Sequence, residues 1–203
     1  MTNKAGHLVQ YESFAEFLLV LTFERDLSVI NYGSQPETFT FYDAEAGKKR
    51  VYTPDFIAWK KGGTEIHEVT RTERQMRPNI QQREVAAHKI CEERNWQYIV
   101  HNEKNLPNGA EKVNLLFLFS YRPSSYYNQD IADKLHLALE SKNNQKLNEL
   151  VNNLAREFDL PVALIFSTMY HLVWHRHLMT DLDKLLLIDG LPDEQAFVWQ
   201  AVK

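Results

Sequence analysis

The sequence contains no run of about 18 or more apolar residues, so it predicts no helix that crosses a membrane. Its first residues, MTNKAGHLVQYES, lack the apolar core of a signal peptide. There is a single cysteine, Cys91, which cannot form a disulfide within the chain. We therefore expect a cytoplasmic protein in which Cys91 is a buried, inert thiol on an amphipathic helix.

An excess of positive charge is also missing, because the 203 residues carry a formal net charge of −4. The distribution is uneven, however: residues 48–94 hold eleven Lys and Arg against seven Asp and Glu. Contacts to phosphates need local rather than global positive charge, so this region is a candidate nucleic-acid surface. A solvated charged face would give the same pattern.

The first half of the chain alternates between helical and extended patterns. Apolar residues repeat at helical spacing over residues 12–25, and Ser13 with Glu16 forms a capping-box pattern at the start. Gly62-Gly63 predicts a tight hairpin between two strands. The full expected order is a helix at 12–25, strands at 27–32, 37–42, 50–61 and 64–70, a helix at 79–94 and a strand at 96–100. This order predicts an α/β fold with a mixed sheet flanked by helices.

The pattern changes near residue 108, where we place a boundary between a domain at 1–108 and a second domain at 109–203. The run VNLLFLF there fits either a buried strand or a short helix. Amphipathic helices follow at 147–158 and 161–176, and HLMTDLDKLLLI fits a short strand and turn. We expect a small helical, winged-helix-like domain that binds a partner protein.

The segment Tyr52-Thr53-Pro54-Asp55-Phe56 carries the first candidate for chemistry, together with Glu68 on the next strand. Twelve residues separate Asp55 from Glu68, and the hairpin turn lies near the middle. Side chains on paired strands have Cβ atoms about 4.5–5.5 Å apart, so the two carboxylates would repel unless a cation lies between them. Oxygen ligands of this kind suit Mg²⁺ or Mn²⁺, which can polarise a phosphoryl group and activate a water.

A third carboxylate, Glu16, is a candidate metal ligand from the first helix. Each of the three residues also has a plain structural interpretation. Asp55 after a proline fits a turn, Glu68 fits an exposed strand position, and Glu16 fits a capping role for Ser13. The functional interpretation depends on all three occurring in this order of elements.

Three stretches, ESFAEFLLVLTFERDLSVINYGSQPETFTF, RVYTPDFIAWKKGG and EIHEVT, together resemble the amino-terminal domain of TnsA endonucleases. With REVAAHKICEERNWQYIV, the resemblance covers about residues 10–105. It implies a restriction-endonuclease-like fold of the PD-(D/E)xK type and a metal-dependent endonuclease that nicks DNA at transposon ends. The helix glutamate of that family falls on Glu16, the aspartate of its TPDF-like strand on Asp55, and the acidic or amide residue of its following strand on Glu68.

The family's lysine falls on Thr70, which carries no charge. Such a lysine orients the attacking water and stabilises the transition state electrostatically. The cation then comes from elsewhere, with Arg74 and the 79–94 helix as candidates, or the site is impaired. We also expect phosphate contacts from a set of arginines, namely Arg71, Arg74, Arg77 and Arg83.

By resemblance, the partners are double-stranded DNA at transposon ends, a DDE-type transposase subunit and an AAA+ regulator. Two alternatives stay open at this point. The first is a nuclease fold that has lost its activity and docks DNA or partner proteins. The second is a stand-alone nuclease of defence or repair.

Overall fold

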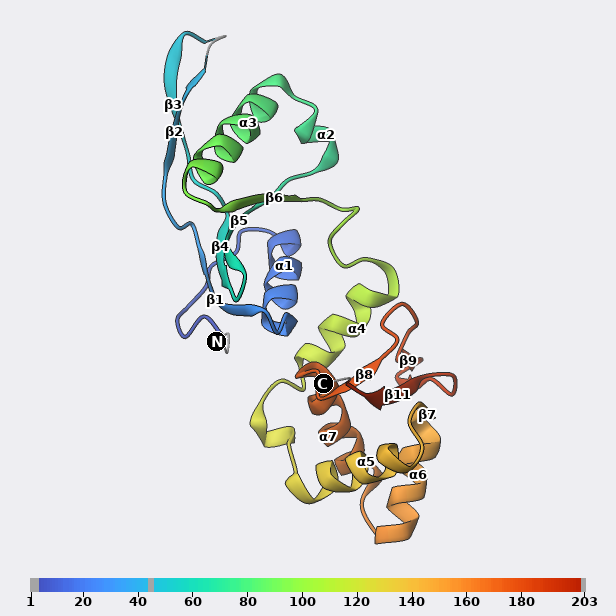
Figure 1. Ribbon diagram of the computed structural model, residues 1–203. Helices are drawn as coiled ribbons and strands as arrows, with labels where there is room; N and C mark the ends of the chain where they lie inside the picture. The colour runs from blue at the N-terminus through green and yellow to red at the C-terminus, as the bar shows by residue number, and fades with distance from the viewer. Residues whose placement is uncertain (1–3, 44–45, 202–203) are drawn as a thin grey trace. The chain divides into compact units, whose positions relative to one another are not determined.

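A computed structural model describes residues 4–43 and 46–201 of the chain. The chain divides into two compact units, Met1–Pro107 and Asn108–Lys203, next to the boundary placed after residue 108 from the sequence. Figure 1 shows a sheet with helices in the first unit and a group of helices with short strands in the second. Among the described residues, no helix is both long enough and apolar enough to cross a membrane.

A mixed four-stranded sheet forms the centre of the first unit (Figure 1). Strand β4 pairs antiparallel with β1 and β5, whereas β6 runs parallel to β5. This arrangement confirms the predicted mixed α/β, restriction-endonuclease-like fold. In spatial order the strands are β1 (Val29–Ser34), β4 (Phe56–Lys60), β5 (Gly63–Val69) and β6 (Gln97–His101).

Helices pack on both faces of this sheet because successive strand residues point to opposite sides. Helix α1 (Phe14–Arg25) packs Leu19, Val20 and Phe23 into a core with Phe56 and Ala58 of β4. On the other face, α3 (Pro78–Glu93) contributes Ala87 and the buried Cys91 to a core with Ile57, Ile66 and Tyr98. A short helix, α2 (Thr72–Gln75), connects β5 to α3.

A separate two-stranded ribbon consists of β2 (Phe39–Asp43) and β3 (Lys48–Tyr52). The prediction of one continuous strand over residues 50–61 is therefore wrong. Thr53, Pro54 and Asp55 separate β3 from β4, because a proline has no backbone N–H to donate to a ladder and commonly precedes a strand. Asp55 consequently stands at the point where the chain leaves the ribbon and enters the central sheet.

The second unit is mostly helical (Figure 1). Residues 113–119 belong to a helix, so the helical alternative for that apolar run is the correct one. The winged-helix-like description of this unit stays a prediction. The helices are α4 (Gly109–Phe119), the 3-10 turn η1 (Ser124–Tyr126), α5 (Gln129–Ser141), α6 (Leu147–Phe158) and α7 (Val162–Trp174). The strands are β7 (Gln145–Lys146), β11 (Phe197–Gln200) and β8 (Leu178–Thr180) in one sheet, and β9 (Leu187–Ile188) with β10 (Leu191–Pro192) in another.

Candidate active site

The carboxylates of Asp55 and Glu68 lie on neighbouring strands of the hairpin between β4 and β5. Phe56 pairs with His67, and continuing that antiparallel register by one residue places Asp55 opposite Glu68. The backbone N–H of Val69 donates to Oδ2 of Asp55 at 2.7 Å, which fixes this carboxylate beside the end of β5. The structure thus brings together two of the predicted ligands through the hairpin that the sequence predicted.

Both carboxylates have a raised pKa. Burial raises the pKa of Glu68 to about 7, and repulsion from Asp55 adds to this shift. Burial likewise raises the pKa of Asp55 to about 6, with a contribution from the negative charge of Glu16. Two buried carboxylates that disfavour each other's ionisation form a site that gains from a cation.

Arg83 of α3 provides positive charge at this pair. Its Nη2 donates to Oε1 of Glu68 at 2.5 Å, and its guanidinium carbon lies 4.4 Å from the centre of the Tyr52 ring. In the structure, Arg83 pairs with a predicted metal ligand, and its contact with phosphate stays a prediction. A cation of the 79–94 helix, one of the two sources considered for the missing lysine charge, thus lies beside Glu68.

The sequence analysis missed two tyrosines in this site. The hydroxyl of Tyr52 donates to Oε2 of Glu68 at 2.5 Å and lies 3.0 Å from the hydroxyl of Tyr98. Burial, together with the negative charge of Glu68, raises the pKa of both tyrosines, so they stay protonated and act as donors. Tyr52 stands directly before Thr53-Pro54-Asp55, but nothing in the sequence connects it to a residue 16 positions away.

Glu84 is a further acidic residue that the sequence analysis did not identify. It follows Arg83 on α3, and burial raises the pKa of its carboxyl group. Its Oε1 is buried without a hydrogen-bond partner among the described residues. The charge of Glu84 contributes to the raised pKa of Glu68, so the two carboxylates belong to one electrostatic environment.

Glu16 occupies the capping position that its plain structural interpretation predicted. Its Oε1 accepts from the Ser13 hydroxyl at 2.7 Å, and its Oε2 accepts from the Glu12 backbone N–H at 2.8 Å. Glu16 is close enough to raise the pKa of Asp55. Within residues 4–43 and 46–201, however, no three His, Cys, Asp or Glu side chains are arranged as a set of metal ligands. The expected convergence of Glu16 with the other two carboxylates is absent from this arrangement.

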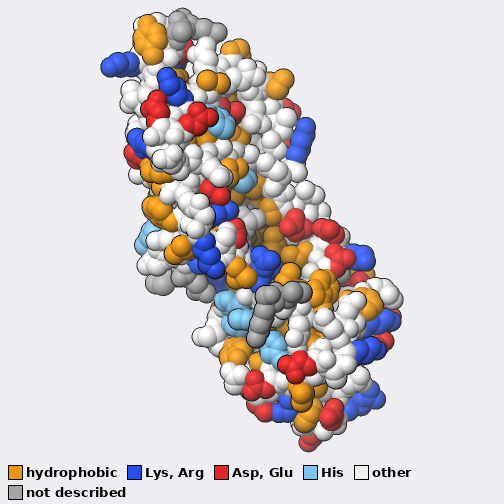
Figure 2. All heavy atoms as spheres, viewed as in Figure 1, with side chains coloured by type: hydrophobic (Ala, Val, Ile, Leu, Met, Phe, Trp, Pro, Cys, Tyr) orange, Lys and Arg blue, Asp and Glu red, His pale blue; other side chains and the backbone are white. Residues whose placement is uncertain are grey.

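Thr70 follows β5 directly, two residues after Glu68, and its backbone N–H donates to the carbonyl of His101 at 2.8 Å. The side chains of Arg71, Arg74 and Arg77 are exposed around α2 and at the start of α3. Figure 2 shows basic side chains distributed over the visible face of the molecule. Their contact with phosphates stays a prediction.

The donor set fits a hard divalent cation. Mg²⁺ commonly binds through one or two carboxylates and completes its shell with water and substrate phosphates, and Asp55 with Glu68 supplies the two carboxylates. Repulsion between them, which contributes to the raised pKa of Glu68, is what a bound cation would relieve. In the present arrangement both oxygens of Glu68 accept hydrogen bonds from the protein.

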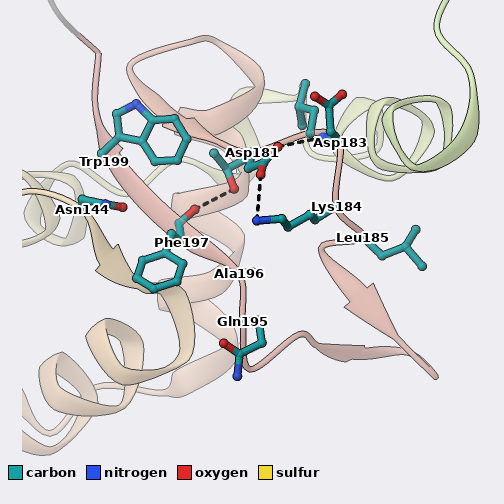
Figure 3. A pocket seen from close by; sticks show the side chains of 11 residues that line it. Asn144, Asp181, Asp183, Lys184, Leu185, Gln195, Ala196, Phe197 and Trp199 are labelled. Carbon is teal, nitrogen blue, oxygen red and sulfur yellow. Dashed lines mark hydrogen bonds and ion pairs between the residues drawn. The ribbon is translucent and has the colours of Figure 1, made fainter.

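A pocket of about 510 Å³ lies in the second unit (Figure 3). The rings of Phe197 and Trp199 line it, and an ion pair of 3.3 Å joins Lys184 to Asp181 at its wall. None of the predicted site residues lines this pocket. It contributes nothing to the carboxylate site described above.

A mixed sheet with helices on both faces and an acidic pair on its central hairpin is consistent with the restriction-endonuclease-like fold. Residues 26–103 match the family model described as "TnsA-like endonuclease N terminal", so this stretch of the chain is similar to the amino-terminal domain of TnsA-like endonucleases. Asp55, Glu68, Thr70 and Arg83 lie within the matched residues, whereas Glu16 lies outside them. No curated protein matches the chain.

Proposed function

We propose that the protein is a metal-dependent DNA endonuclease subunit of a multi-subunit transposase and nicks DNA at transposon ends. The observation that supports this proposal most directly is the pair Asp55 and Glu68, joined by Arg83, inside the stretch that matches the TnsA-like family. The family description relates the chain to nucleases of transposition. The metal, the nicking of one strand and the particular partners are our proposal.

Asp55 and Glu68 would hold Mg²⁺ or Mn²⁺ in this function. When bound, the ion would polarise the scissile phosphate and lower the pKa of an attacking water. Asp55 is fixed by the Val69 N–H, and Glu68 is oriented by the Tyr52 hydroxyl. These contacts restrict both carboxylates before DNA arrives, which lowers the cost of organising the site during the reaction.

Arg83 takes the electrostatic role that the family assigns to a lysine. Its charge lies against Glu68, next to where a phosphate would approach the carboxylates. A guanidinium can stabilise negative charge that develops on phosphate oxygens, and loss of one such group commonly costs about 10²–10³ in rate. A guanidinium supplies this charge through several N–H donors in a fixed geometry, which suits the oxygens of a phosphate.

The proposed partners are double-stranded DNA at transposon ends, a DDE-type transposase subunit and an AAA+ regulator. We assign the binding of one of these two proteins to the second unit, Asn108–Lys203. This unit has its own helices and sheet and contributes no residue to the carboxylate pair.

The test is nicking of DNA that carries a transposon end, with the partner transposase and Mg²⁺ present. Wild-type protein should nick one strand, and Asp55→Ala should reduce the rate by at least about 10² because a ligand is lost. Lys104→Ala, an exposed substitution in the same unit, serves as the control. Equal nicking by the Asp55→Ala variant would exclude this function.

A second candidate function is a docking subunit without nuclease activity. Thr70 lacks the charge of the family's lysine, and both oxygens of Glu68 are engaged by Arg83 and Tyr52. Under this alternative, the wild-type protein would support transposition while Asp55→Ala had no effect on it. The nicking assay and a transposition assay on the same variants separate the two functions.

A further inference from the structure

The ribbon of β2 and β3 has a solvent-facing surface that the proposed active site does not use. Its outer residues are Thr40, Tyr42, Lys49 and Val51, in two cross-strand pairs, Thr40 with Val51 and Tyr42 with Lys49. All four are exposed, and the aromatic and branched side chains are among the most exposed of their kind, with Tyr42 at 65% and Val51 at 72%. Tyr42 and Val51 lie diagonally across the ribbon, so the outer face offers apolar area that a partner can contact.

The charge of this ribbon is positive although the chain as a whole is acidic. Strand β3 contributes three consecutive cations, Lys48, Lys49 and Arg50, and all three are exposed. Within β2 and β3 the only carboxylate is that of Asp43, which is buried and paired with Arg50 at 2.5 Å. Among the described residues, neither lysine pairs with a carboxylate: Lys49 lies on the outer face of the ribbon, and Lys48, opposite Asp43, lies on the other face near the tip.

The base of the ribbon belongs to the active site. Tyr52 is the last residue of β3 and donates to Glu68, and the chain reaches Asp55 three residues later. At about 3.3 Å per residue, Lys48 and Lys49 lie roughly 10–13 Å along the strand from Tyr52. One strand of DNA carries a phosphate about every 3.4 Å of helix axis, so these lysines are within about four nucleotides of a phosphate held at the carboxylates.

On the inner side, the ribbon is fixed to the folded unit. Phe39 and Tyr52 pack in the core that also contains Ala87 and Cys91 of α3. The guanidinium of Arg94 lies over the Phe39 ring at 5.5 Å. One side of the ribbon is thus anchored beside the site while the other side faces solvent. Figure 1 shows the ribbon extending beyond the central sheet, and Figure 2 shows hydrophobic and basic side chains together at that end of the first unit.

We propose that the β2–β3 ribbon is a DNA-binding arm that contacts the phosphate backbone of duplex DNA next to the cleavage site, through Lys48 and Lys49. This inference rests on the proposed nuclease function and adds the surface that holds the substrate. The positive charge favours DNA over a protein strand added to the ribbon edge, because exposed lysines on an edge oppose such pairing. Tyr42 and Val51 provide apolar contact area beside Lys49 on the outer face.

The experiment measures binding of the full chain to a short DNA duplex without metal, across a series of salt concentrations. The double variant Lys48→Ala/Lys49→Ala should bind on the order of tenfold more weakly at low salt and lower the slope of log affinity against log salt by about 2. The charge-conserving variant Lys48→Arg/Lys49→Arg should bind like the wild type. Thermal melting of both variants shows that the fold is intact.

The matched control removes two exposed lysines elsewhere in the first unit, as Lys61→Ala/Lys104→Ala. The proposed DNA-binding arm would be wrong if the ribbon variant kept the wild-type slope of log affinity against log salt, or if this control lost as much DNA affinity as the ribbon variant. The ribbon would then be a protein-binding surface at most. Nicking by wild-type protein in the same preparation tests the proposed function separately. Salt-dependent binding through the ribbon without nicking would support the arm and contradict the nuclease function. No binding by the wild type would overturn the arm, and the nicking assay would still decide the nuclease function.

Discussion

Arg83 and Thr70 are the two residues that bear on the positive charge of the candidate active site. Thr70, on which the lysine of the TnsA resemblance falls, follows the strand that carries Glu68 directly. The positive charge instead reaches Glu68 from α3, across the face of the sheet, through Arg83. Because α3 packs on the side to which Glu68 points, a cation on this helix can replace one on the strand.

The first prediction concerns this replacement. Arg83→Ala should lower the nicking rate by about 10²–10³, because the site loses its preorganised charge. Thr70→Lys should change the wild-type rate little, yet restore much of the loss when combined with Arg83→Ala. The measurement is single-turnover nicking with partner transposase and Mg²⁺, for the two single variants and the double variant.

Arg83→Lys is the matched control, because it keeps the charge and shortens the reach. A full wild-type rate for Arg83→Ala would show that Arg83 only neutralises Glu68. If Thr70→Lys accelerates the wild type strongly, the natural site lacks the charge and the docking function gains support.

The second prediction concerns the raised pKa of Glu68. The folded state holds its proton up to a pKa of about 7, whereas the usual value is 4.5. The folded state therefore binds a proton that the unfolded state releases, and stability falls as pH rises between these two values. Glu68→Gln should melt at a higher temperature than wild type at pH 8, by an amount worth up to about 3 kcal/mol.

The difference between the two proteins should nearly vanish below about pH 4.5, where Glu68 is protonated in both states. Comparing variant with wild type is necessary because burial lowers the pKa of His101 to about 4 and also lowers that of His67. Because the pKa of each histidine is lowered, the histidines make the folded state less stable as pH falls. This pH dependence is opposite in sign to that of Glu68 and covers an overlapping pH range. A constant difference between pH 4 and pH 8, in metal-free buffer, would contradict the role of Glu68.

At the level of elements, the hairpin between β4 and β5 fixes the register of the two carboxylates. Lys60 pairs with Gly63, so the turn consists of Lys61 and Gly62 rather than of the two glycines that the sequence suggested. Gly63 has φ of +140°, a conformation that residues with a Cβ rarely adopt, whereas Gly62 has no such restriction and faces open space.

The third prediction uses the two glycines as a matched pair. Gly63→Ala should destabilise the protein by about 1–2 kcal/mol, because the alanine Cβ strains the backbone at this φ. Gly62→Ala should change stability by less than about 0.5 kcal/mol. Urea unfolding of both variants measures the two values. Similar losses for both would mean that the turn has a different conformation in solution.

The elements that were predicted correctly are those with local signals. The Ser13–Glu16 capping box, the hairpin and the helix over 79–94 follow from residues a few positions apart. The failures involve contacts over a long sequence distance. The Tyr52–Tyr98 contact joins residues 46 positions apart, and the Arg83–Glu68 pair depends on which side of α3 faces the sheet. The run at 113–119 was ambiguous because short apolar stretches fit a helix or a strand equally well.

At the scale of the whole molecule, the first unit contains everything that the proposed chemistry requires. Both of its cores are built from its own residues, including Leu106 close to its end. The carboxylate pair, Arg83 and the ribbon all precede residue 107. The second unit has a separate fold with α5, α6 and α7 packed together, and it supplies none of these groups.

The last prediction follows from this division. A chain of residues 1–107 should melt cooperatively and keep ribbon-dependent binding to duplex DNA, because its cores and cations are complete. It should fail to bind the transposase partners, because we assign that contact to the second unit. A chain of residues 1–101, which lacks the buried Leu106, should be less stable by roughly 2 kcal/mol or more and serves as the control for the cut. Melting curves, salt titrations of DNA binding and pull-down with purified partners measure these three properties. If residues 1–107 bound the transposase partners normally, the partner-binding surface would belong to the first unit. The second unit would then have no assigned role.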